Sequence, residues 1–205
     1  MNHYIKKPFN IVEIVLAIGV IGIGLASVMA LFPVGSNAMR DAMATGYSAN
    51  MADQMLHQLE QVARNNWSGV IDTGGSNKFL RDGYPSSPAS TLEDFDYSGA
   101  GVDCFDTPRK TIYYESGSND GVYKILSFSD KDGDGERDSD ETVDFQAIMV
   151  LWKKRIDING DGSRDSDDPP LSMAAELHAE VSWPAQRPYG QRETSTYRLE
   201  LFNRN

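Results

Sequence analysis

The chain begins with a long stretch in which apolar positions are continuous. Residues 14–32 carry no charge and one polar side chain, Ser27. A run of this length predicts a membrane-spanning helix, because crossing the hydrocarbon core takes ~20 apolar residues. Residues 1–8 form a short, polar and basic leader containing Lys6 and Lys7. The positive-inside rule therefore keeps the leader in the cytoplasm and places the rest of the chain outside.

After Pro33 the pattern changes to that of an amphipathic helix. Small and apolar residues recur at alternating spacings of four and three, which places them on one helix face. These residues are Ala38, Ala42, Thr45, Ala49, Ala52, Leu56, Leu59 and Ala63. Pro33 is predicted to kink or interrupt the helix, and Ser36 or Asn37 to cap its continuation. The helix is expected to stop near residues 65–69.

The later part of the chain has the pattern of strands. The segment 67–110 is rich in Gly, Ser, Pro and Asp and predicts a variable, irregular region with a short helix near 90–95. Strand-like runs follow at 111–115, 122–129, 143–156, 175–183 and 195–202. Alternation in the last two favours an antiparallel sheet with one apolar face. The expected fold class is α+β, with a long N-terminal helix packed on about four or five strands.

Composition excludes several functions. The chain has 30 acidic and 19 basic residues, a formal net charge of −11, so nucleic-acid binding is not expected. Its single cysteine, Cys104, permits no intrachain disulfide, which leaves burial or pairing between subunits. Neither His57 nor His178 lies in a catalytic pattern, and no phosphate-binding glycine loop is present. We therefore expect no enzymatic activity.

One acid stands at the start of the apolar run. Glu13 follows Phe9 by four positions. A carboxylate costs ~2.5–3.5 kcal/mol at the bilayer centre, so a partner is expected. The short basic leader, the aromatic Phe9 and Glu13 together resemble the N-terminus of type IV pilins and of the pseudopilins of type II secretion.

The resemblance implies a processing site and an assembly contact. In this family a prepilin peptidase cuts before an aromatic residue and the new N-terminus is methylated, which corresponds here to Pro8 and Phe9. Glu13 falls on the family's conserved acid, which neutralises the terminal amine of a neighbouring subunit. The family has Gly, less often Ala or Ser, before the cut, whereas this chain has Pro8. Two N-termini are therefore compatible with the sequence: Phe9 after cleavage, or Met1 without it.

The resemblance also implies a pilin-like fold and an order of events from membrane insertion to filament assembly. Residues 1–8 correspond to a prepilin leader, 9–33 to the membrane-spanning and then filament-core helix half, and 34–66 to the amphipathic half. Residues 67–110 correspond to the variable surface region and 111–205 to the β domain. The subunit would wait in the inner membrane and then join copies of itself or other pilins in an extracellular or periplasmic filament. Pilus or pseudopilus, and major or minor subunit, stay open.

The alternative is that the apolar helix is an ordinary signal anchor. The protein would then be a single-span, membrane-anchored calcium-binding or adhesive domain that acts without filament assembly. A secretory signal peptide fits less well, because its apolar core is about 7–15 residues long.

Two acidic loops repeat each other and match the pattern of a calcium loop, with oxygen ligands at positions 1, 3, 5, 7, 9 and 12 and glycine at position 6. In the first loop the ligands are Asp130, Asp132, Asp134, Glu136, Asp138 and Glu141. In the second they are Asp157, Asn159, Asp161, Ser163, Asp165 and Asp168. Glu136 and Ser163 would each bind through the backbone carbonyl. Gly135 and Gly162 allow the sharp turn.

The flanks of the loops predict their role. Both lie between predicted strands, so they resemble the acidic loops of thrombospondin type 3 repeats and dockerins more than a regulatory EF-hand. Two Ca²⁺ ions would hold two long hairpin connections closed at opposite ends of the sheet. Magnesium fits less well, because it keeps its waters and takes fewer protein ligands. A solvated acidic turn is the alternative.

Overall fold

The computed structural model describes residues 10–73, 79–86, 102–103, 112–114, 120–133, 141–163 and 166–204. The chain divides into two compact units, Met1–Met43 and Ala44–Asn205. Several predicted features lie outside the described residues: Pro8, Phe9, the short helix at 90–95, Cys104, Asp134, Gly135, Glu136, Asp138 and Asp165.

The first unit is helical and apolar. Helix α1 (Ile11–Asn65) begins here, and each of residues 10–43 is exposed. Asn10 supports its first turn, because its carbonyl accepts the N–H of Glu13 at 2.9 Å. The hydroxyl of Ser27 donates to the carbonyl of Ile23 at 2.9 Å, so this polar side chain is satisfied within the helix. By length and composition the helix can cross a membrane, as predicted.

The predicted interruption at Pro33 is wrong. Helix α1 continues through this residue, and neither Ser36 nor Asn37 begins a new helix. A proline removes one backbone donor and typically costs ~3 kcal/mol in a helix interior. Ending the helix in apolar surroundings would leave several backbone groups without partners, which costs more.

In the second unit α1 buries one stripe. Its buried residues are Ser48, Met51, Ala52, Met55, Leu56, Leu59 and Ala63. The prediction is confirmed at Ala52, Leu56, Leu59 and Ala63, whereas Thr45 is exposed. Met51 and Met55 are also buried but were not predicted, because the predicted apolar face was placed through Ala49 and Ala52. The helix ends within the predicted range, and the short α2 (Trp67–Val70) follows, where the Asn66 side chain accepts the Gly69 N–H at 3.1 Å.

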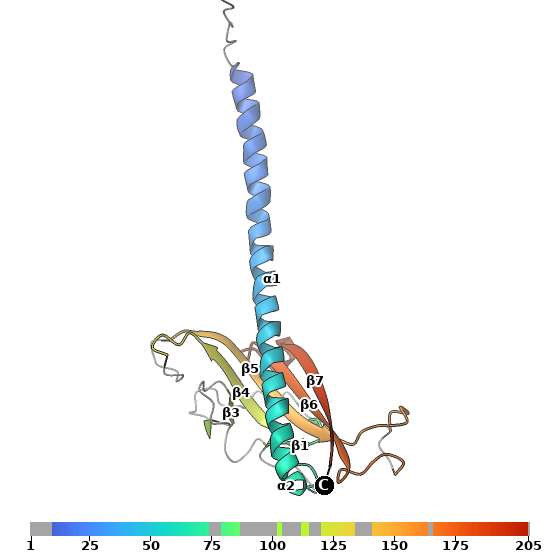
Figure 1. Ribbon diagram of the computed structural model, residues 1–205. Coiled ribbons are helices and arrows are strands. Elements are labelled where there is room, and N and C mark those ends of the chain that lie inside the picture. Colours follow the sequence, from blue (N-terminus) through green and yellow to red (C-terminus); the bar gives the residue numbers. More distant parts are fainter. Residues whose placement is uncertain are drawn as a thin grey trace, which may run out of the picture. The chain divides into compact units, whose positions relative to one another are not determined.

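The described strands form a seven-stranded sheet (Figure 1). They are β1 (Arg81–Asp82), β2 (Val102–Asp103), β3 (Ile112–Tyr114), β4 (Val122–Phe128), β5 (Val143–Lys154), β6 (Ala174–Trp183) and β7 (Glu193–Phe202). The path β2-β3-β4-β5-β6-β7 is antiparallel throughout, so the predicted meander is confirmed. Strands β1 and β2 fall in the segment predicted to be irregular. β1 pairs in parallel with the end of β5, which makes the sheet mixed.

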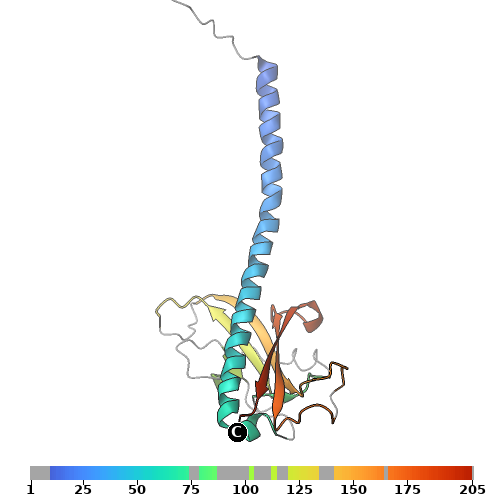
Figure 2. The same cartoon turned by 45° about the vertical axis from the view of Figure 1, so that its right-hand side comes forward.

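The main core lies between α1 and one face of the sheet, and Figures 1 and 2 show the later part of the helix along that face. On β6 the predicted inward residues Leu177, Ala179, Val181 and Trp183 all belong to this core. On β7 Leu201 is buried and Leu199 packs beside it. Burying one such side chain stabilises the fold by ~1.5–3 kcal/mol, so this contact fixes the helix on the sheet.

The prediction of a single apolar face is wrong for the centre of the sheet. On the face opposite α1, a second cluster contains Val122, Ile148, Val150, Trp152 and Ala185. Tyr84 and the Tyr189 of the short η1 (Tyr189–Gln191) pack against it. Both tyrosine hydroxyls donate to Glu180, at 2.9 and 2.7 Å. The segments that follow β1 and β6 therefore cover this face, which explains the continuous apolar run on β5.

A lysine is buried at the end of β5. Lys153 is 1% exposed, and its ammonium donates to the carbonyls of Ile71 and Thr73 at 2.8 and 3.1 Å and to the Thr73 hydroxyl at 2.8 Å. It thereby ties the chain after α2 to the sheet. Burial lowers the pKa of Lys153 below its ordinary 10.5, although the nearby Asp82 and Asp72 partly oppose this shift.

Replacing Leu59, a core residue that is 1% exposed, tests the helix–sheet contact. Leu59→Ala should lower the free energy of unfolding by about 2–5 kcal/mol, because it removes buried methyl groups and leaves a cavity. Urea unfolding of the full chain in neutral detergent measures the change. Gln61→Ala, at an exposed position of the same helix, should change it by less than about 0.5 kcal/mol. Equal effects of the two substitutions would contradict the packing.

The buried lysine predicts a pH dependence of stability. The unfolded chain holds the Lys153 proton more tightly than the fold does, so stability should rise as pH increases from the lowered pKa toward 10.5. Lys153→Met should lose this rise. The two proteins are compared by urea unfolding below pH ~10, before ordinary tyrosines ionise. An identical pH slope in both proteins would show that Lys153 is not desolvated.

Candidate metal sites

The two acidic loops lie at opposite ends of β5, as predicted. The first joins β4 to β5, and the second joins β5 to β6. The loop before β5 and the loop after β5 lie at opposite ends of this strand, and therefore at opposite ends of the sheet along the strand direction (Figure 1). Any ion bound in each loop would therefore act independently on one end of the same central strand.

The first loop brings three predicted ligands together. One carboxylate oxygen each from Asp130, Asp132 and Glu141 lies within 4.8 Å of the others. Glu141 is buried and accepts the N–H of Lys131 at 2.6 Å. Asp130 accepts the N–H of Gly133 at 2.7 Å. These bonds fix one side of each carboxylate and leave further lone pairs for a cation.

The second loop is held by the same kind of bonds. Asp157 accepts the N–H groups of Gly160 and Gly162, at 2.7 and 2.9 Å. Asp168 is buried and accepts the N–H of Ile158 at 3.0 Å. A backbone donor at the second position therefore closes the loop onto the acid at the twelfth.

Comparing the loops shows that they repeat in structure as well as in sequence. In each, the acid at position 1 accepts from the glycine at position 4, and the buried acid at position 12 accepts from the residue at position 2. Gly162 at position 6 has φ +82°, as predicted. Gly133 and Gly160, the glycines at position 4, were not predicted to adopt a positive φ, but their φ angles are +81° and +72°. Because both loops carry glycine at this position, the repeat itself could have indicated this role.

The predicted ligands of the second loop are not gathered as closely as those of the first. Asp161 accepts the N–H of Ser163 at 2.7 Å and the Nδ2 group of Asn159 at 2.8 Å. Hydrogen bonds from Ser163 also lower the pKa of Asp161, so this carboxylate stays ionised. Among the described residues no three-carboxylate group forms in this loop.

One carboxylate oxygen in the second loop, Oδ2 of Asp168, is buried. It has no hydrogen-bond partner among the described residues, and the residue is 4% exposed. Burying a carboxylate oxygen in this way is costly unless a donor or a cation satisfies it. The ligand set contains only oxygens, which suit a hard cation, and Ca²⁺ takes about 6–8 of them. A cation in the loop would therefore remove the cost at Asp168.

The described part of the assembly site is a single residue. Glu13 is exposed in the first turn of α1, within the apolar unit, whereas Pro8 and Phe9 lie outside the described residues. The predicted contact between Glu13 and a terminal amine involves another copy of the chain. It therefore stays a prediction.

His57 and His178 contact acidic or aromatic side chains of the helix and the sheet. His57 is exposed on α1 beside Asp53 and Glu60, at 3.4 and 3.2 Å. His178 stacks on Trp152 with ring centroids 5.0 Å apart, and its Nε2 lies 3.1 Å from Glu176. This stacked pair could not be predicted from local sequence, because Trp152 lies on β5 and His178 on β6.

No family model, curated protein or solved structure matches the chain. The candidate sites therefore depend on the geometry of the chain's own residues. The acidic loops are supported by their repeated hydrogen bonds and by the unsatisfied oxygen of Asp168.

Asp168→Asn tests the metal sites. For the wild-type chain, Ca²⁺ at 100 times its dissociation constant should raise Tm by about 5–10 °C over the value in chelator. In Asp168→Asn the rise should be smaller, and Tm in chelator should be higher than wild type, because no unpaired buried charge remains. Differential scanning calorimetry measures both.

Asp144→Asn is the matched control, since Asp144 is an exposed acid on β5 outside both loops. It should keep the wild-type response to Ca²⁺. A response that is absent from the wild type, or equal in all three proteins, would contradict a calcium site that includes Asp168.

Proposed function

We propose that the protein is a structural subunit of a type IV pilus-like filament or pseudopilus, stabilised by calcium and without enzymatic activity. The observation that carries this proposal is the acid Glu13 in the first turn of an exposed apolar helix. Large hydrophobic side chains such as Ile11, Ile21 and Phe32 are each at least 67% exposed. Soluble monomers rarely expose an apolar surface of this extent, so the helix requires lipid or other helices around it.

Two environments satisfy the same helix in turn. Before assembly it anchors the subunit in the inner membrane, where backbone groups are paired within the helix and side chains face lipid. After assembly, copies of the helix from neighbouring subunits replace the lipid. The filament then lies in the periplasm or outside the cell.

Glu13 favours assembly over simple anchoring. A signal anchor has no use for a carboxylate in the first turn of the apolar helix. In a low-dielectric helical core, a carboxylate and an amine attract far more strongly than in water. The proposed partner is the terminal amine of Phe9 on a neighbouring subunit, released when the prepilin peptidase cuts after Pro8.

Calcium supports the domain that faces outward. In both loops the acid at position 12 accepts the backbone N–H of the residue at position 2, and the carboxylates repel one another without an ion. Extracellular calcium modules bind with dissociation constants of about 10⁻⁴–10⁻³ M, so weak sites suffice there. The proposed ions are therefore structural, one in each loop.

The second candidate is a membrane-anchored calcium-binding or adhesive domain that acts alone. The exposed apolar helix favours it equally, because lipid alone would cover the helix. The two candidates differ in whether helices of neighbouring chains ever meet.

Substituting Glu13 separates these candidates. Glu13→Ala should leave expression and membrane level unchanged and reduce filaments at least about tenfold, because an unpaired amine in the core costs more than 1.4 kcal/mol. Immunoblots of membranes and electron microscopy of the sheared fraction measure the two quantities.

Asp41→Ala provides the control, since it removes an exposed acid from the same helix outside the apolar run. It should assemble normally. Filaments of normal number and length from Glu13→Ala would rule out the assembly role, and an equal loss in both variants would show a general effect of charge.

A further inference from the structure

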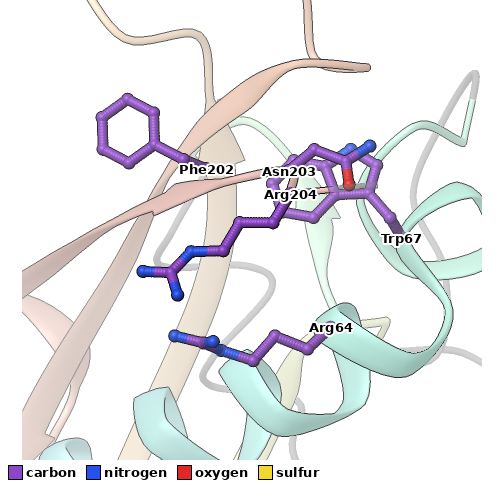
Figure 3. Close-up of a pocket in the computed structure, with 5 residues that line it drawn as sticks. All are labelled: Arg64, Trp67, Phe202, Asn203 and Arg204. Atoms are coloured by element: carbon purple, nitrogen blue, oxygen red, sulfur yellow. The ribbon is translucent and has the colours of Figure 1, made fainter.

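A second polar site lies in the second unit, at the end of α1. Two adjoining hollows of about 170 and 210 Å³ share Arg64, Trp67, Phe202 and Arg204 in their lining. Asn203 completes the smaller one (Figure 3). The hollow therefore joins the last turn of α1, the start of α2 and the end of β7.

Hydrogen bonds fix the walls of this hollow in advance. The indole N–H of Trp67 donates to the carbonyl of Leu171 at 2.8 Å. Asn203 donates to Met173 through its backbone at 2.8 Å and to Ser172 through its side chain at 2.9 Å. A ligand would therefore meet a site whose backbone and aromatic wall are already ordered, which lowers the entropy cost of binding.

The charge of the hollow differs from that of the chain. Arg64 pairs with Glu60 at 3.1 and 2.5 Å, and this contact lowers the pKa of Glu60. No acid pairs with Arg204 among the residues that the structure describes. Glu200 also lines the larger hollow, but its neighbours Leu199 and Leu201 pack in the core, so its side chain points to the opposite face.

Two guanidinium groups thus share the smaller hollow, and no described acid belongs to its lining. Figure 3 shows both groups reaching into the same space. The described lining of the smaller hollow therefore carries two positive charges, on a chain whose formal net charge is −11. An oxyanion between the groups would remove their repulsion and accept paired N–H donors from either arginine.

We infer that this hollow binds one oxyanion group, a carboxylate or a phosphate, between Arg64 and Arg204. A volume near 170 Å³ holds one such group and is smaller than the ~300–1,000 Å³ of drug-sized pockets. The group has two possible sources. It is either an acidic side chain of another copy of this acid-rich chain or a free small anion. The site depends on neither calcium nor filament formation.

Inorganic phosphate is the probe. Full-length protein in neutral detergent is compared in phosphate and in chloride at equal ionic strength. At ten times its dissociation constant, phosphate should raise the wild-type Tm by about 3–6 °C. Arg204→Gln should lose this rise, and Arg187→Gln, which removes an exposed arginine elsewhere, should keep it.

A second variant separates binding from damage to the fold. Arg204→Glu supplies a carboxylate beside Arg64, so its Tm in chloride should be at least that of Arg204→Gln and should not respond to phosphate. An equal phosphate response in wild type and Arg204→Gln would reduce the effect to bulk salt and overturn the inference. So would the absence of any response in the wild type.

Sedimentation in the same buffers assigns the source. A fall in wild-type particle mass on adding phosphate, absent in Arg204→Gln, would identify the natural ligand as a carboxylate of another copy. A phosphate-dependent Tm rise without a change in mass would identify a free anion.

Discussion

The burial of one α1 stripe against the sheet is the interaction on which the rest of the second unit depends. Leu56, Leu59 and Ala63 belong to one core cluster with side chains of β5, β6 and β7. These strands follow the helix by about 80 residues or more in the sequence. This contact packs the helix on β5, which lies between β4 and β6 and carries one acidic loop at each end. It also places the end of α1 beside the end of β7, where the arginine-lined hollow lies. Loss of the contact would therefore disturb every proposed site of this unit.

The first unit obeys a different constraint. Its described residues, 10–43, are all exposed, and the surface is almost entirely apolar between Ile14 and Phe32. Transfer of these hydrophobic side chains out of water is favourable, and in the proposed assembly lipid covers them first and other helices later. One charged residue, Glu13, limits how that surface can be covered. The proposed assembly follows from these two properties together.

Local patterns in the sequence predicted much of the fold. The apolar run, the helical spacing of Leu56 and Leu59 and the alternation on β6 each depend on near neighbours, and the structure confirms them. Features that depend on distant residues were not predictable. The pairing of Arg81 with Trp152 joins two segments with no shared pattern, and the burial of Lys153 depends on carbonyls of Ile71 and Thr73. At the loops, the ligand types were readable, but the unsatisfied oxygen of Asp168 appears only once burial is known. The continuation of α1 through Pro33 was not predicted. A proline destabilises a helix locally, but ending the helix in apolar surroundings would cost more free energy, because several backbone groups would lose their hydrogen bonds.

Processing and assembly of the chain through its N-terminal helix are the basis of the proposed function. Intact-mass and fragment-ion mass spectrometry of the protein from the cell envelope examines the N-terminus itself. We expect a mature chain that begins with N-methylated Phe9. A population that begins uniformly at Met1 would contradict this proposal, because Glu13 would then have no Phe9 amine to meet.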